Sequence, residues 1–125
     1  MDEVFHGQPC IRLRAGNGDT ALVALHGAQV LSWVAAGRER LYLSPRAVFD
    51  GQAAIRGGIP LCFPQFNQRG PLPKHGLARN LAWAAQAPAW NAEQDAAVLR
   101  LWLRSSERTR ALWPQDFEVQ LTVSL

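Results

Sequence analysis

Two short segments of the chain carry side chains that can bind an anion. Residues 56–60, RGGIP, place Arg56 beside two glycines that let the backbone approach a ligand closely. Residues 73–80, PKHGLARN, bring Lys74, His75 and Arg79 together. Arginine matches phosphate oxygens in pairs, lysine adds a point charge, and histidine can donate to a sugar hydroxyl or ring oxygen. These four side chains therefore predict a binding site for a sugar phosphate.

Each of these residues also has a purely structural interpretation. A loop histidine such as His75 is commonly satisfied by a backbone carbonyl. Arg56 and Arg79 can instead form surface ion pairs with Asp50 or Asp116. The residue types alone leave both alternatives open.

Short β-prone segments separated by turn-prone residues make up most of the chain, and no long helical pattern appears. One helical turn is predicted at 105–110, with serine as its N-cap, before Trp113-Pro114. The first two β-prone segments form a predicted hairpin around the AGNGD turn. We expect strands at 9–14, 20–25, 29–35, 40–45, 80–86, 97–103 and 117–125.

The candidate site lies in a long irregular segment, Phe49 to Arg79, which holds five glycines and four prolines. Its apolar residues would be unusual in a solvated linker. We therefore expect the loop to pack down on the strands and to present its polar groups at a fixed place.

The last segment, Phe117 to Leu125, alternates apolar and polar residues throughout and predicts a half-buried strand. No turn or covering partner follows it, so we expect the chain to be part of a larger fold. The alternative is an ordinary C-terminal edge strand. An uncovered edge of this kind also predicts a homo-oligomer formed through open strand edges.

Composition narrows the class of protein. The 125 residues suit one domain, the net charge is +3, and only one of the thirteen basic residues is lysine. That bias favours bidentate recognition of phosphate or carboxylate, although a GC-rich genome produces the same bias. The arginines are interspersed with acids, which argues against nucleic-acid binding.

No segment is apolar and long enough to span a membrane, and no secretory leader is evident, so we expect a cytoplasmic protein. Cys10 and Cys62 fit no metal-ligand spacing and are expected to be reduced core thiols.

Several motifs, taken in order, resemble one known family. The runs RGGIPLCFPQF, LPKHGLARNLAW and LWPQDF, preceded by LHGAQVLSW, LYLS and FDGQAAIRGGIP, are similar to the glucose-6-phosphate 1-epimerase branch of the aldose 1-epimerase superfamily. The resemblance implies an all-β fold, an antiparallel β-sandwich of the galactose-mutarotase-like type. Residues 1–125 would form the N-terminal portion of one such domain, which would be incomplete.

The same resemblance implies interconversion of the α and β anomers of a hexose 6-phosphate, with no metal or other cofactor. In that family the arginines of the RGG and HGLARN motifs hold the substrate, which points to Arg56 and Arg79. Lys74 stands where the family often has glutamine, and it exchanges an amide for a cation with no acceptor. His75 matches a histidine near the sugar ring and receives an orienting, auxiliary role.

The family's catalytic acid, a histidine in a Leu-His-Thr-Tyr-Phe-like segment, and its catalytic base, a later glutamate, match no residue of this chain. His6, His26, Glu107 and Glu118 are not substitutes for them. The chain is therefore expected to carry the substrate-binding half of the site and no catalytic residue. The alternatives are a noncatalytic sugar-phosphate-binding module and a truncated remnant.

Overall fold

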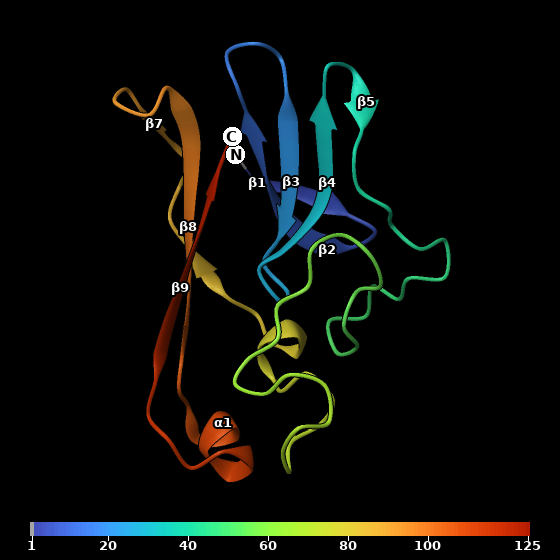
Figure 1. Ribbon diagram of the computed structural model, residues 1–125, viewed down its shortest axis with the longest axis vertical. Coiled ribbons are helices and arrows are strands. Elements are labelled where there is room, and N and C mark those ends of the chain that lie inside the picture. Colours follow the sequence, from blue (N-terminus) through green and yellow to red (C-terminus); the bar gives the residue numbers. More distant parts are fainter. Residues whose placement is uncertain (1) are drawn as a thin grey trace.

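The computed structural model describes residues 2–125, which form two antiparallel sheets that pack face to face (Figure 1). The first sheet has the order β1-β2-β3-β4-β5. Its strands follow one another as a meander: β1 (Asp2–Phe5), β2 (Gln8–Arg14), β3 (Thr20–Ala24), β4 (Gln29–Ala35) and β5 (Arg38–Glu39). The predicted hairpin is confirmed, because Arg14 pairs with Thr20 across the turn.

The second sheet is built around one long strand, β8. Two short strands pair along one edge of β8, and the last strand pairs with Val98–Arg104 on the other edge. The strands are β6 (Ala84–Ala85), β7 (Ala89–Asn91), β8 (Ala96–Arg104) and β9 (Glu118–Ser124). The alternation predicted for the last segment is confirmed by the burial of β9, whose residues are exposed and half-buried in turn.

The core lies between the two sheets. Ile11 and Leu13 of β2 meet Leu99 and Leu101 of β8 there, and all four side chains are at most 5% exposed. A second, smaller cluster covers the other face of the first sheet, where Ile55 from the long loop packs. The centre of the first sheet is therefore buried on both faces, which explains why β2, β3 and the first half of β4 are more apolar than simple alternation predicts.

The only α-helix in residues 2–125, α1 (Glu107–Leu112), joins β8 to β9. Its N-cap is Ser106, whose hydroxyl accepts from the backbone N–H of Thr109, while the Thr109 hydroxyl accepts from the backbone N–H of Ser106. The helical turn predicted at 105–110 is thus confirmed together with its serine N-cap, although the helix begins and ends two residues later. No helix in this part of the chain is both long and apolar enough to cross a membrane.

Several local predictions are wrong. Residues 40–45 form no strand, because only Leu43 makes an isolated bridge, to Gly57 of the long loop. Residues 80–86 shorten to β6, preceded by the 3-10 helix η1 (Ala78–Asn80). Cys10 is buried as expected, but Cys62 is exposed because its segment runs along the surface. Both cysteines are free thiols.

Candidate functional site

The turn that carries Arg56 is pinned by two glycines. Gly57 has φ +115° and Gly58 has φ +61°. A Cβ added at Gly58 would lie 2.1 Å from the carbonyl oxygen of Val30, so β4 approaches the turn too closely for any other residue. The turn is also bonded to its neighbours, because the Gly58 N–H donates to Tyr42 O at 2.7 Å. The Arg56 side chain is exposed above this fixed backbone.

A buried glutamine on β4 supports the same turn. Gln29 has no exposed surface, and its Nε2 donates to the carbonyl of Ile55 at 2.7 Å and to that of Gly57. These two carbonyls flank Arg56 in the chain. The other amide atom, Oε1, is buried with no hydrogen-bond partner in residues 2–125. Sequence reasoning missed Gln29; the available signal was a polar residue that opens the apolar run QVL.

The HGLARN segment is held by an equally close backbone contact. His75 and Gly76 both adopt positive φ, +65° and +79°. A Cβ at Gly76 would lie 2.3 Å from the carbonyl oxygen of Phe63, which accepts from the Leu77 N–H at 2.9 Å. The segment therefore depends on glycine at this position, as the RGG turn does.

Lys74, His75 and Arg79 lie together in this segment. The Nη2 of Arg79 donates to the Lys74 carbonyl at 3.0 Å, and the Nδ1 of His75 accepts from the backbone N–H of Asn67 at 2.9 Å. The pKa of His75 is lowered by desolvation first, and then by the positive charges of Arg79 and Lys74. A neutral His75 whose Nδ1 accepts must carry its proton on Nε2, which leaves an N–H donor for a ligand.

The turn between β3 and β4 and the first residues of β4 contact both arginine-bearing segments. The Nε2 of His26 lies 2.9 Å from Ala53 O, and Gln29 holds the carbonyls beside Arg56. On the other side, the Gly27 N–H donates to Leu81 O at 2.7 Å, and a Cβ at Gly27 would lie 2.8 Å from Arg79 O. Residues 26–30 therefore form a common support for both segments.

The guanidinium groups of Arg56 and Arg79 share no hydrogen-bond partner within residues 2–125. The proposed ion pairs are also absent from this part of the chain: Asp116 pairs with Arg110 at 2.7 Å, and Asp50 accepts from the backbone N–H groups of Gln52 and Ala53. The backbone alternative for His75 is met in part, by an amide N–H and not by a carbonyl.

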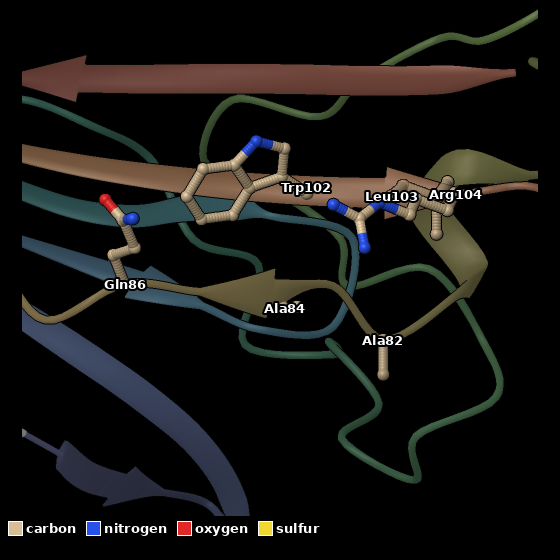
Figure 2. Close-up of a pocket in the computed structure, with 6 residues that line it drawn as sticks. All are labelled: Ala82, Ala84, Gln86, Trp102, Leu103 and Arg104. Carbon is tan, nitrogen blue, oxygen red and sulfur yellow. The ribbon is translucent and has the colours of Figure 1, made fainter.

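Two cavities lie near these elements. One, of about 280 Å³, is enclosed by the HGLARN segment, α1 and Gln52. The other, of about 500 Å³, lies beside β6 and β8, where Figure 2 shows the Trp102 indole between the Gln86 amide and the Arg104 guanidinium. Their lining residues include none of the four predicted binding residues. No group of three or more His, Cys, Asp or Glu side chains in residues 2–125 is placed to hold a metal ion.

Comparison with known proteins identifies the family. The family model for aldose 1-epimerase matches residues 9–125. A Salmonella typhimurium protein described as a "putative glucose-6-phosphate 1-epimerase" is 46% identical over 101 residues, which are 78% of this chain and 33% of that protein. A protein of the same description from Cenchrus ciliaris is 40% identical over 117 residues, 90% of this chain and 36% of that protein.

A solved structure agrees with this assignment. The crystal structure of a "putative mutarotase" from Salmonella typhimurium superposes with a TM-score of 0.86 at 36% identity, over 99% of this chain and 42% of that one. The predicted all-β fold of the galactose-mutarotase-like type is confirmed by this match and by the antiparallel sheets. This chain spans about a third of the length of the curated relatives it matches. The chain belongs to the aldose 1-epimerase family.

Proposed function

We propose that this chain supplies the substrate-binding half of a site that interconverts the α and β anomers of a hexose 6-phosphate, with glucose 6-phosphate as the first candidate. Arg56, Lys74 and Arg79 bind the phosphate, and His75 donates from Nε2 to a sugar oxygen. The whole protein's activity is part of this proposal, because the chain spans only about a third of its curated relatives.

The observation that carries the proposal is the common support of the two arginine-bearing segments. Residues 26–30 contact the backbone beside Arg56 through Gln29 and the backbone of Arg79 through Gly27. A common support fixes the separation of the two backbone segments, so less ordering is needed for both arginine side chains to meet one phosphate. The description of the relatives as glucose-6-phosphate 1-epimerases supports the same substrate class.

Arg79 retains donors for such a ligand. Its Nε is buried without a partner, and one Nη2 hydrogen is used on the Lys74 carbonyl. The remaining Nη hydrogens are available, since arginine has five N–H donors in all. The neighbouring Lys74 is exposed and adds a second positive charge to the same segment.

Anomer exchange needs one group to protonate the ring oxygen and another to take the proton from the anomeric hydroxyl. His75 suits an auxiliary role here, because its lowered pKa keeps the ring neutral and its Nε2–H can only donate. The acid and the base belong to the family's later segments, by the resemblance described above. These residues therefore bind the substrate in this proposal and transfer no proton.

The test compares glucose 6-phosphate with glucose by isothermal calorimetry. Arg79→Ala should weaken glucose 6-phosphate by roughly 10- to 150-fold, the equivalent of about 1.5–3 kcal/mol for a charge-assisted pair, and should change glucose binding much less. Arg110→Ala is the matched control, because Arg110 lies on α1 and its guanidinium group is paired with Asp116. Equal losses for both ligands would remove the phosphate role of Arg79.

A noncatalytic sugar-phosphate-binding module is the second candidate, favoured because no residue of this chain matches the family's acid or base. Magnetization-transfer NMR measures the exchange of glucose 6-phosphate anomers directly. If the isolated chain binds glucose 6-phosphate without accelerating anomer exchange, both candidates remain. If a longer protein that contains this chain does accelerate the exchange, the chain is the substrate-binding half of an epimerase. Faster exchange by these residues alone would show that the assignment of the acid and base is wrong.

We also propose that copies of the chain associate through the outer edge of β9. That edge has no partner strand in residues 2–125, and half-buried apolar residues alternate along β9. Unpaired edges promote strand addition. Light scattering should give a mass that rises above 13.8 kDa with concentration, and a constant mass of 13.8 kDa would contradict the proposal.

A further inference from the structure

The cavity of about 280 Å³ is built by three segments that are far apart in the chain. Gln52 comes from the first part of the long loop, Leu77 and Asn80 from the HGLARN segment, and Arg108 and Leu112 from α1. Its volume lies just below the roughly 300–1,000 Å³ of sites for drug-sized ligands. The cavity therefore suits a ligand somewhat smaller than a drug-sized molecule.

Its walls are fixed before any ligand arrives. The reciprocal bonds between Ser106 and Thr109 cap α1, and the Arg110–Asp116 pair ties α1 to the following segment. On the opposite side, Asn80 Nδ2 donates to the Gln52 carbonyl at 2.9 Å and joins two of the three walls. A preformed cavity loses less entropy on binding than one that must be ordered.

The polar groups of the cavity have unused hydrogen-bonding capacity. Arg108 forms no ion pair with any carboxylate in residues 2–125, in contrast to Arg110 on the same helix. The Gln52 side-chain amide has no partner in this part of the chain, and Asn80 keeps its Oδ1 unused. One unbalanced cation beside two amides favours an anionic ligand that also has a hydrogen-bonding oxygen.

The remaining surface of the cavity is apolar. Leu77 is buried, whereas Leu112 is 52% exposed although it is a large hydrophobic residue at the mouth of the cavity. Leu112 is one of several large hydrophobic residues that are exposed in residues 2–125, and here it offers apolar surface next to a cation. An apolar chain of a ligand would cover Leu112 while its charged end meets Arg108.

We propose that this cavity is a binding site for a small organic anion, a carboxylate or phosphate monoester with a short apolar chain. Arg108 binds the anionic group, Gln52 and Asn80 bind its remaining oxygens, and Leu77 and Leu112 cover the chain. The site is separate from the proposed sugar-phosphate residues, none of which lines it.

The experiment titrates the 125-residue chain with n-butyl phosphate, butanoate and, as the uncharged control, 1-butanol, followed by proton–nitrogen NMR. We expect saturable shifts of the Thr109 and Leu112 amides and of the Gln52 and Asn80 side-chain amides with one or both anions.

Arg108→Gln should raise the dissociation constant at least about tenfold, because a charge-assisted bond is lost. Arg110→Gln should leave it unchanged. Butyl phosphate alone would identify phosphate monoesters as the ligands, and butanoate alone would identify carboxylates.

Four results would overturn the proposal. The first is no shift at these groups up to roughly 20 mM of either anion, where even weak sites fill. The second and third are 1-butanol binding as tightly as the anions, and Arg110→Gln raising the dissociation constant as much as Arg108→Gln. The fourth is a response confined to the Trp102 indole N–H, which would place the probe in the cavity of Figure 2. Arg79→Gln separates the two sites. It should weaken sugar-phosphate binding and leave the dissociation constants of the butyl anions unchanged, so either site can fail without the other.

Discussion

Replacement of Gln29 by methionine tests the support beneath the Arg56 turn. The variant keeps the length of the side chain but removes both donors to the carbonyls of Ile55 and Gly57. Each buried carbonyl left without a partner costs about 1–3 kcal/mol. The variant also removes Oε1, which is already buried and unpaired, and this returns about one such cost. The net loss of stability is therefore the cost of one group, about 1–3 kcal/mol.

Urea unfolding followed by tryptophan fluorescence measures this loss, with the midpoint and the slope compared between variants. Gln8→Met is the matched control, because Gln8 is half-buried and makes one bond, to Phe49 O at 3.0 Å, so we expect a loss of only about 0.5–1.5 kcal/mol. If Gln29→Met loses no more stability than Gln8→Met, the Gln29 amide does not hold the two carbonyls beside Arg56.

Gln29→Glu adds a pH dependence with a defined sign. Its buried carboxyl group faces two carbonyls, so the folded state favours the protonated form, which can donate one bond. The folded pKa is then above the unfolded value of about 4.3, and the folded state holds more protons in the interval between the two. The stability of this variant should therefore fall as the pH rises through that interval, whereas the loss in Gln29→Met should not change with pH. A stability of Gln29→Glu that rises with pH would contradict this geometry.

Three further outcomes are expected. Gly27→Ala should lower the free energy of unfolding by about 1–2 kcal/mol because of its φ of +75° alone, and by more because its Cβ would lie 2.8 Å from Arg79 O. An unchanged free energy of unfolding in urea would show that the contact is not tight. The His75 ring should titrate by NMR with a midpoint below 6.5, and Arg79→Gln should raise that midpoint because it removes a positive charge. Because the lowered pKa means that the folded state resists protonation, this histidine should cost stability as the pH falls below 6.5. A midpoint above 6.5 would contradict the local charge pattern. A thiol reagent should label Cys62 rapidly in the folded chain and Cys10 only on unfolding, because burial raises the pKa of Cys10 to about 11; rapid labelling of both would mean that Cys10 is not buried.

Periodicity and turn residues predicted the main strands because their burial is regular. β9 is half-buried along one face, so apolar and polar residues alternate in its sequence, and the AGNGD turn marks the hairpin between β2 and β3. The strand β1 was missed because it has only four residues, DEVF, and the first two are acidic, so its sequence carries little apolar pattern. The short β7 was missed for a related reason, since it has three residues and pairs only with β8.

Long-range contacts account for the other errors. The segment 40–45 is rich in β-prone residues, but its Leu43 meets Gly57 of the long loop instead of a strand, and no local pattern encodes that partner. Glycine positions in the candidate site were predictable as a class, whereas their reasons, Val30 at Gly58 and Phe63 at Gly76, are visible only in three dimensions. The role of Gln29 is of the same kind, since its partners lie 26 and 28 residues away in the chain.

A double-mutant cycle on Arg56 and Arg79, with glucose 6-phosphate binding measured by calorimetry, shows whether the two arginines hold one phosphate. If both guanidinium groups hold one phosphate, each single change to alanine weakens binding, and the two losses are coupled by about 0.5 kcal/mol or more because they share a ligand group. Independent losses, or an Arg56→Ala variant that binds glucose 6-phosphate as tightly as the unchanged chain, would contradict it.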